Sequence, residues 1–440
     1  MAHYVCFDGC EGVRYPLDQV IYRCEECGGL LDVEHDVDLL KQKSGSEWRD
    51  QFDSASLRAG HGSGSGVWSK KEWVLPDIAT RDIVSLGEGN SPLIEAGSMG
   101  RELGLGKLYV KQCGLSHTGS FKDLGMTVLV SQVKAMRRSG VEVAALGCAS
   151  TGDTSAALAA YCAAARIPSV VFLPEDKIST AQLVQPLSHG SKVLSLQTDF
   201  DGCMKLIQEV VESLPIYLAN SMNSLRLEGQ KTVAFEIAQQ LNWQVPDWVV
   251  VPGGNLGNVY ALYKGFKLMQ DLGVTNRMPR LVVAQASEAN PLARAFEEGW
   301  ESYEPIVAGD TVATAIRIGD PVSVKRAMRA IDGSDGIVDH ASERELCDTM
   351  ARADRAGQFV CPHTAVALAV LEKLVNKHTI RPGDRAVVVS TASALKFTET
   401  KVAYHERRLP GVISLRANQP KRHSADPEEV VEALTKALRL

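Results

Sequence analysis

The feature that most constrains the fold is a regular alternation of short β-branched runs with helical stretches, which begins near Ser85. The clearest strand patterns lie at residues 141–148, 169–173, 192–197, 216–219, 248–251, 281–285 and 386–390. Helical patterns lie between them at residues 155–165, 180–189, 204–214 and 228–240. Such alternation is typical of βαβ units, in which helices cover both faces of a parallel sheet. We therefore predict an α/β fold with open, mostly parallel, twisted sheets.

Three polar clusters follow strands of this pattern, and ligands of open α/β sheets bind at the carboxyl ends of the strands. Residues 149–155 lie between a strand and an alanine-rich helix, where backbone N–H groups and hydroxyls can hold an anion such as a carboxylate. The glycines of residues 252–258 allow close approach to a phosphate. Residues 390–393 offer hydroxyls to a ring nitrogen. Each cluster alone could be an ordinary capped turn, but the three together indicate a binding site.

Lys122 lies just inside the start of a predicted helix, with Ser120 as its expected N-cap and Gly140 at its end. The unpaired N–H groups of a first helical turn favour the neutral amine of a lysine, and an aldehyde cofactor needs that neutral form. An isolated lysine at such a position is ordinarily just a solvated helix residue. The neighbouring motif makes Lys122 a candidate Schiff-base lysine instead.

Four of the ten cysteines are clustered near the start of the chain, as a C-x3-C pair and a C-x2-C pair. They are Cys6, Cys10, Cys24 and Cys27. Four thiolates at this spacing can close a tetrahedral structural zinc site, and the alternative is a ribbon whose thiols hold no metal. A catalytic metal is disfavoured because four protein ligands leave no open position. The other six cysteines lie in apparent core segments, which indicates a reducing compartment.

Composition excludes several classes of function. The chain has 440 residues, 45% hydrophobic residues and a formal charge of −6, which fits a soluble protein of two or three domains. No long basic run favours a nucleic acid as partner, and no apolar stretch is long enough to span a membrane. The first residues have no signal pattern. We expect a cytoplasmic protein that binds neither nucleic acid nor membrane.

Long motifs resemble one enzyme family from about residue 30 to about residue 410. They are GVWSKKEW at residues 66–73, HTGSFKDLG at 117–125, CASTGDTS at 148–155, NSMNSLRLEGQ at 220–230 and GNLGN at 254–258. In these motifs the sequence resembles the threonine synthases, closest to their plant-type branch. These are fold type II pyridoxal-phosphate enzymes of the tryptophan-synthase-β type.

The resemblance implies conversion of O-phospho-L-homoserine and water into L-threonine and phosphate, by γ-elimination followed by addition of water at Cβ. It implies that Lys122 is the catalytic residue and holds pyridoxal 5'-phosphate as an imine. The remaining implied cofactor contacts are Asp153 at the 3-hydroxyl, Thr391 at the ring nitrogen, and Gly254, Asn255, Leu256, Gly257 and Asn258 at the phosphate. Asp153 departs from most relatives on this fold, which carry asparagine there.

A second phosphate, that of the substrate, also needs a binding group. Arg226 is the expected bidentate partner, because its planar fork matches phosphate geometry. The other substrate residues implied are Lys111, Ser150, Thr151, Thr154, Asn220, Ser221 and Asn223. Arg226 distinguishes this reading from a serine/threonine dehydratase or a β-replacement synthase, neither of which would need it. An inactive adaptor with a zinc ribbon is a further alternative, against which the intact lysine and three loops argue.

The plant-type branch also implies a homodimer activated by S-adenosylmethionine. The implied effector residues are Gly64, Ser65, Gly66, Trp68, Ser85, Leu86 and Gly87. The glycine- and serine-rich stretch at residues 54–66 is otherwise a plain linker.

The expected domain organisation has three parts. Residues 1–84 form an N-terminal segment with the cysteine ribbon and the Gly/Ser-rich loop. Residues 85–410 form a two-lobed catalytic body whose smaller lobe, at about 120–225, is inserted in the larger one. Residues 411–440 form a C-terminal extension that ends in a helix.

Overall fold

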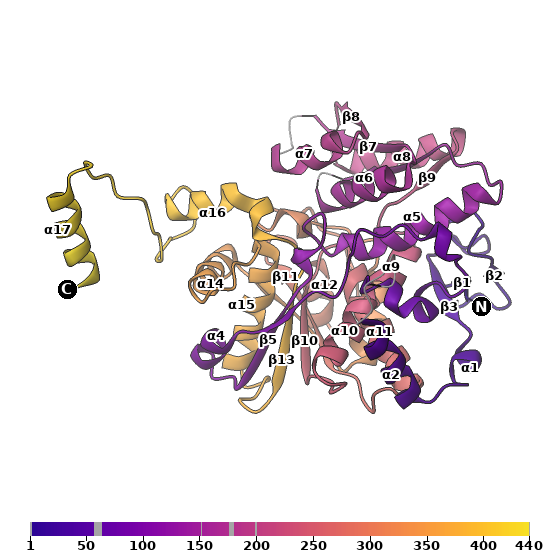
Figure 1. Cartoon of the computed structure of the whole chain (residues 1–440), viewed down its shortest axis with the longest axis horizontal. Helices are drawn as coiled ribbons and strands as arrows, with labels where there is room; N and C mark the ends of the chain where they lie inside the picture. The colour runs from indigo at the N-terminus through magenta and orange to yellow at the C-terminus, as the bar shows by residue number, and fades with distance from the viewer. Residues whose placement is uncertain (1, 57–63, 151, 176–179, 199, 440) are drawn as a thin grey trace.

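A computed structural model of the chain describes residues 2–56, 64–150, 152–175, 180–198 and 200–439 (Figure 1). Its largest sheet has six strands in the order β12-β11-β10-β13-β5-β4. They are β4 (Leu93–Glu95), β5 (Lys107–Gln112), β10 (Trp248–Pro252), β11 (Arg280–Ala286), β12 (Ile337–Ala341) and β13 (Arg385–Ser390). All neighbours in this sheet are parallel except β4 and β5. The predicted mostly parallel α/β fold is confirmed.

Both faces of this sheet are buried, and alternate residues of one strand belong to different cores. On β10, Val249 and Val251 pack in one core, and Trp248 and Val250 pack in the other. This follows from the two-residue period of a strand, and it explains why β10 is an unbroken apolar run. The covering helices are α11 (Gly257–Asp271), α12 (Pro291–Glu297), α13 (Val324–Gly333), α14 (Glu343–Arg355) and α15 (Pro362–Asn376).

A second, fully parallel sheet forms the upper lobe in Figure 1, with its strands in the order β8-β7-β6-β9. They are β6 (Ala145–Ala149), β7 (Ser169–Pro174), β8 (Lys192–Leu196) and β9 (Ile216–Leu218). The helices of this lobe are α5 (Lys122–Arg138), α6 (Asp153–Ala165), α7 (Thr180–Ser188) and α8 (Phe200–Ser213). The short helices α9 (Leu225–Gln230) and α10 (Thr232–Gln240) then lead back into the lower part of the molecule.

The N-terminal ribbon is a three-stranded antiparallel sheet in the order β2-β1-β3. Its strands are β1 (Ala2–Cys6), β2 (Arg14–Tyr15) and β3 (Leu31–His35). The short helices elsewhere are α1 (Val37–Leu40), α2 (Gly45–Ser56), α3 (Lys71–Val74), α4 (Gly97–Glu102) and α16 (Thr398–His405), with 3₁₀ turns η1 (Trp68–Lys70), η2 (Thr80–Asp82), η3 (Cys113–Leu115), η4 (Thr314–Ile316) and η5 (Ala394–Phe397). The last helix, α17 (Pro427–Leu438), stands apart from the body (Figure 1).

Several predicted boundaries are wrong. The strand predicted at 141–148 begins only at Ala145, and the helix predicted at 228–240 is two helices with Lys231 between them. Phe121, and not Ser120, occupies the N-cap of α5, although the Ser120 hydroxyl accepts a hydrogen bond from the Lys122 N–H at 3.4 Å. Among the described residues, no helix is long and apolar enough to cross a membrane.

Candidate active site

Lys122 is the first residue of α5, and the end of strand β13 fixes its turn. The Phe121 N–H donates to the Thr391 carbonyl at 2.9 Å, and Ser120 forms a β-bridge with Ala392. The Lys122 ammonium lies 4.3 Å from the centre of the Phe121 ring. The structure therefore brings the predicted ring-nitrogen residue, Thr391, next to the predicted catalytic lysine.

The surroundings of Lys122 favour its neutral form. Burial and, to a smaller extent, the positive charge of Arg226 lower its pKa to about 7, and Asp153 partly opposes the shift. Among the described residues, no hydrogen-bond or ion-pair partner holds its ammonium. An amine that is largely neutral near pH 7 can attack an aldehyde or accept a proton.

The glycine-rich loop leads from β10 into the first turn of α11. Leu256 adopts the left-handed conformation with φ of 64°, which turns the chain into the helix. A methyl group at Gly254 would lie 3.1 Å from Ile316, so the backbone packs too closely for most side chains. Both side-chain polar atoms of Asn258 are buried without a partner in the described structure. This 15-residue helix thus opens with free donors, which is the arrangement that binds phosphate.

Arg226 lies on α9, and its guanidinium is buried without a carboxylate partner in the described part of the chain. The residue is 2% exposed, Nη1 donates to the Ala219 carbonyl at 3.2 Å, and Nη2 lies 3.5 Å from the Thr154 hydroxyl. Its Nε has no partner at all among these residues. Burial lowers its pKa to about 10, so it remains charged at neutral pH. A buried guanidinium with unused donors is suited to an oxyanion.

The sequence did not indicate Lys396, which lies on η5 and pairs with Asp153. Its Nζ is 2.5 Å from the Asp153 carboxylate, and both side chains are about nine-tenths buried. Asp153 itself is the first residue of α6, one position before Thr154. The negative charge of Asp153 is therefore balanced by Lys396. The hydroxyl-rich segment at residues 390–393 did not indicate this cation.

The other predicted substrate residues fall into two groups. The Ser150 hydroxyl accepts hydrogen bonds from the N–H groups of Gly152 and Ser155 at 3.3 Å, so it shapes the start of α6. Asn220 bonds both backbone polar groups of Ala149, and Asn223 donates to Tyr217 and Leu218. Ser221 lies half-buried in the turn before α9, and the predicted residue Thr151 lies outside the described residues.

Lys111 pairs with a carboxylate inside the protein. Its ammonium is fully buried and bonds the Glu236 carboxylate at 2.5 Å, the Ser91 carbonyl at 2.5 Å and the Gln240 side chain at 3.0 Å. All three of its donors are therefore used within the protein. The structure gives Lys111 a role in holding β5 to α10 and no free donor for a substrate phosphate.

The predicted effector segments meet at one buried residue, Glu88, which sequence reasoning missed. Its side chain accepts from the Ser65 hydroxyl at 2.5 Å, the Ser85 hydroxyl at 2.9 Å and the Leu86 N–H at 2.9 Å. Its backbone carbonyl accepts from the Gly66 N–H at 2.8 Å. The other effector residues lie close by: Gly64 accepts from Asn90, Gly87 donates to Ser85, and the Trp68 indole donates to Thr127.

The four N-terminal cysteines come together at one end of the ribbon. Their sulfur atoms all lie within 4.8 Å of one another. The Cys6 and Cys27 sulfurs are 3.5 Å apart, and all four thiols are free. The other six cysteines are buried in the body, as expected from their apolar surroundings.

Comparisons with known proteins agree with this geometry. Residues 84–392 match the family described as pyridoxal-phosphate dependent enzyme. The chain is 57% identical to threonine synthase 2, chloroplastic, of Arabidopsis thaliana, over 97% of this chain and 83% of that protein. It is 40% identical to the threonine synthase of Methanocaldococcus jannaschii, over 90% of this chain and 93% of that one.

Among solved structures, the threonine synthase of Escherichia coli superposes with a TM-score of 0.68. It has 19% sequence identity and covers 99% of this chain and 100% of its own, so it supports the fold alone. The family match and the two close relatives carry the assignment further. This chain belongs to the pyridoxal-phosphate-dependent enzymes and, within them, to the threonine synthases.

Proposed function

We propose that Lys122 and Arg226 carry out the reaction of this threonine synthase, in which O-phospho-L-homoserine and water become L-threonine and phosphate. One observation supports these roles above all others. Arg226 is a buried guanidinium whose Nε has no partner in the described structure, and its charge is close enough to lower the pKa of Lys122. A dehydratase with an unphosphorylated substrate would have no group to neutralise that cation.

The residues present also fit pyridoxal phosphate. Lys122 offers a neutral amine, the unpartnered Asn258 side chain and the start of α11 offer donors to a phosphate, and Thr391 offers a hydroxyl beside the lysine. When bound, pyridoxal phosphate supplies the conjugated system that stabilises negative charge on the substrate. A hydroxyl partner at its ring nitrogen, rather than a carboxylate, would weaken this stabilisation of negative charge.

The remaining work falls to the protein. Lys122, as a neutral amine, removes the proton from substrate Cα and then transfers protons between Cα, Cβ and Cγ of the substrate. Arg226 holds the phosphate on Cγ and stabilises its charge as it leaves, with the Thr154 hydroxyl beside it. Ser150, Thr151 and the N–H groups at the start of α6 bind the carboxylate of the substrate. Asp153 would contact the 3-hydroxyl of the bound cofactor, and Lys396, which pairs with its carboxylate at 2.5 Å, balances its charge.

The organisation at larger scale is also part of the proposal. We divide the chain into residues 1–84, a catalytic body at 85–410 with the lobe at about 120–225, and an extension at 411–440. S-adenosylmethionine would bind as an activator where the segments 64–68 and 85–87 meet around Glu88, at the interface of a homodimer. A cytoplasmic location, where thiols stay reduced, is supported by the buried thiols of Cys113, Cys148 and Cys162 in the body.

Substitutions of Arg226 test the substrate assignment. Arg226→Lys keeps the charge but loses the fork, and Arg226→Ala loses both. The fall in kcat/KM for O-phospho-L-homoserine should therefore grow in that order. A buried charged hydrogen bond contributes about 1.5–3 kcal/mol, which corresponds to roughly ten- to more than a hundredfold in rate. Arg137→Ala, an exposed arginine on the helix of Lys122, is the control and should change nothing.

A phosphate-free amino acid separates the phosphate role from a purely structural one. Binding of L-threonine, followed by the change in the visible spectrum of the bound cofactor, should be nearly indifferent to the Arg226 variants. Equal losses for the two ligands would mean that Arg226 supports the fold or the carboxylate site. Efficient deamination of L-threonine by the unmodified protein would favour the dehydratase instead.

A further inference from the structure

The four cysteine sulfurs have the geometry of a closed metal site. A tetrahedral zinc ion with bonds of about 2.3 Å places its four sulfurs roughly 3.8 Å apart. Here all four lie within 4.8 Å of one another, and Cys6 and Cys27 are 3.5 Å apart. The Gly29 N–H points at the Cys27 sulfur from 3.4 Å, as expected for a thiolate. Four thiolates without a cation at this distance would repel one another.

The ribbon that these cysteines close is too small to hold its own shape. Strand β2 has only two residues, and the whole sheet comprises three short strands. Segments of this size generally need a metal or disulfides to fold, and no disulfide joins the described cysteines. A bound metal would supply that missing free energy.

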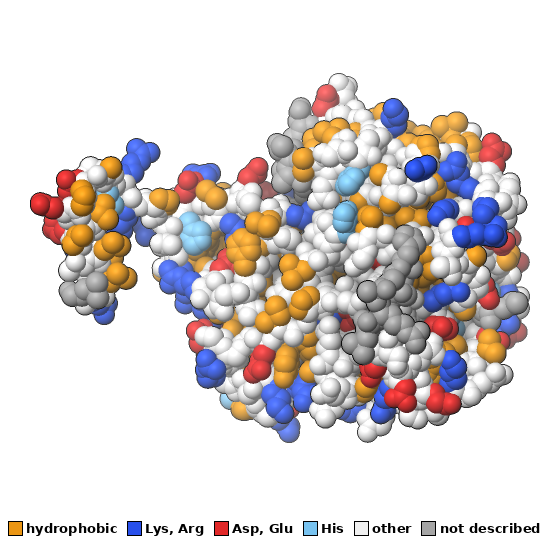
Figure 2. All heavy atoms as spheres, in the orientation of Figure 1, with side chains coloured by type: hydrophobic (Ala, Val, Ile, Leu, Met, Phe, Trp, Pro, Cys, Tyr) orange, Lys and Arg blue, Asp and Glu red, His pale blue; other side chains and the backbone are white. Residues whose placement is uncertain are grey.

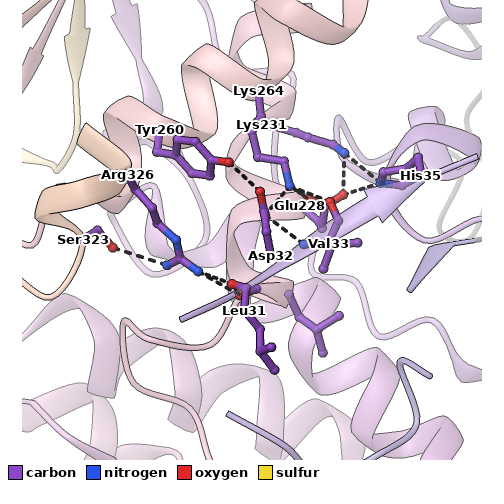
Figure 3. Close-up of polar contacts among 12 residues, drawn as sticks. Leu31, Asp32, Val33, His35, Glu228, Lys231, Tyr260, Lys264, Ser323 and Arg326 are labelled. Carbon is purple, nitrogen blue, oxygen red and sulfur yellow. Dashed lines mark hydrogen bonds and ion pairs between the residues drawn. The ribbon is translucent and has the colours of Figure 1, made fainter. Parts of the chain in front are cut away.

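The third strand of the ribbon, β3, is docked on the catalytic body by a buried ionic network (Figure 3). His35 Nε2 lies 2.5 Å from the Glu228 carboxylate on α9. Lys264 of α11 bonds the other Glu228 oxygen at 2.8 Å and Asp32 of β3 at 2.6 Å. Lys231, between α9 and α10, also bonds Glu228. Glu228 is fully buried, and Lys231 and Lys264 together balance its charge and that of Asp32, while burial lowers the pKa of His35 to about 4 and leaves it a neutral partner of Glu228.

Arg326 links β3 to the supports of both proposed phosphate-binding sites, Arg226 and the 254–258 loop. Arg326, itself fully buried, donates to the Leu31 carbonyl of β3 and to the Ser224 hydroxyl at 3.0 Å. Ser224 is the N-cap residue of α9, two positions before Arg226. Arg326 Nη1 also reaches the Ser323 hydroxyl at 3.4 Å, and the Ser323 N–H donates to the Asn255 carbonyl of the glycine-rich loop. One strand of the ribbon therefore contacts the supports of Arg226 and of the 254–258 loop.

We propose that Cys6, Cys10, Cys24 and Cys27 bind one Zn²⁺ and that the zinc-held ribbon is a brace that fixes α9. Glu228, which Figure 3 shows bonded to β3, lies two residues after Arg226 on α9, so displacement of β3 would shift the helix that carries the guanidinium. His35 and Asp32 are positioning residues, because they act through α9 and touch no substrate. The brace rests on the proposed function of Arg226 as the substrate-phosphate group.

Metal content tests the first half. The full-length protein, purified without a metal-binding tag, should contain one zinc per chain, and titration with a mercurial should release it. Cys24→Ser should abolish the zinc, whereas Cys347→Ser, a buried cysteine of α14, should retain it. A preparation that is free of metal and fully active overturns the site. A ribbon closed by disulfides in the active protein also overturns it.

Kinetics test the brace with two neighbours on one strand. His35→Ala should raise KM for O-phospho-L-homoserine about tenfold with a smaller change in kcat, because Arg226 is displaced while Lys122 is not. Glu34→Ala changes the exposed face of the same strand and should have no effect. His35→Gln, which keeps a donor to Glu228, should restore most of the loss. Cofactor absorbance and L-threonine binding should not change in any variant.

The outcomes separate the two proposals. If Arg226→Ala impairs only the phosphorylated ligand but His35→Ala impairs both ligands or neither, the brace is wrong and the proposed function stands. If Arg226→Ala itself shows no selectivity, the proposed function fails and the brace fails with it. Should Cys24→Ser not fold, zinc content of the unmodified chain and the His35 pair still decide each half.

Discussion

At the residue scale, the site holds two basic side chains, Lys122 and Arg226, that form no ion pair with a carboxylate among the described residues. Burial and the charge of Arg226 lower the pKa of Lys122 to about 7, and burial lowers the pKa of Arg226 to about 10. Because the arginine keeps its proton while the lysine gives it up near neutrality, one is suited to bind an anion and the other to act as a base, as we propose. A carboxylate paired with the arginine would occupy its anion-binding donors. A carboxylate paired with the lysine would stabilise its charged form.

Removing the lysine side chain is the most direct test of this arrangement. Lys122→Ala should abolish covalent attachment of pyridoxal phosphate and the visible absorbance that it produces, and turnover should fall to background. Thermal unfolding should match that of the cofactor-free unmodified protein, because the amine has no partner in the described structure. Retained turnover would show that another group does this chemistry.

The lowered pKa predicts a pH dependence that does not require turnover. In cofactor-free protein, the rate of pyridoxal phosphate attachment should rise about tenfold per pH unit below pH 7 and level off above it. The sign follows because a lowered folded-state pKa means that the amine loses its proton as the pH rises through about 7 instead of the ordinary 10.5. Arg226→Met should move the midpoint upward, since one cause of the shift is removed. A rate that continues to rise to pH 10 would contradict this environment.

At the scale of elements, helices α5 and α9 bring Lys122 and Arg226 together because they cross at two glycines. A methyl group at Gly229 would lie 1.7 Å from the Leu124 carbonyl oxygen, and one at Gly125 would lie 2.8 Å from the Arg226 carbonyl oxygen. Neither contact is possible without a shift of backbone. Gly125 and Gly229 therefore allow the two helices to cross this closely, although neither glycine by itself predicts the crossing.

This crossing predicts a large effect from one methyl group. Gly229→Ala should destabilise the protein by about 1–3 kcal/mol, because overpacking forces the helices apart, and it should lower kcat/KM by separating the two cations. Gly383→Ala, where a methyl group meets nothing within 4 Å, serves as the matched control. Thermal unfolding and steady-state kinetics of both variants measure the two effects. An unchanged unfolding midpoint in Gly229→Ala would mean that the helices do not pack this closely.

At the scale of the whole molecule, the C-terminal helix stands outside the packed body. None of the residues of α17 is buried, and its Val431, Leu434 and Leu438 are more than half exposed. Figure 2 shows these hydrophobic side chains on a helix separated from the rest of the protein. Apolar surface that stays in water contributes nothing to folding.

Deletion of residues 421–440 should therefore be nearly silent. We expect the unfolding midpoint to stay within about 2 °C and kcat/KM to stay within about twofold, because no buried contact is lost. Calorimetry, steady-state kinetics and light scattering on the full and truncated chains provide the comparison. A clear loss of stability, or a smaller assembly after truncation, would indicate that α17 packs against a second copy.

Much of the fold and site could be predicted because their signals are local. The alternation of β-branched and helical segments predicts the α/β class. The strand predicted at 169–173 ends within one residue of the observed end of β7. The lysine motif, the glycine-rich loop and the cysteine quartet are each contained in a few residues. The break at Lys231 in the helix predicted at 228–240 has no such local signal, since Glu228 and Lys231 contact His35 of β3, which is far away in the sequence.

The sequence by itself determined the α/β class and was enough to propose the catalytic lysine and the residues that bind phosphate and zinc, because backbone periodicity and short motifs need no distant partner. Only the tertiary structure decided which charges meet. Lys111 pairs with Glu236, and Asp153 pairs with Lys396. Glu228 of α9 pairs with His35 of β3. These pairs join residues far apart in the chain, and a buried charge is satisfied by whichever opposite charge the packing brings within reach. No spacing along the sequence encodes that choice.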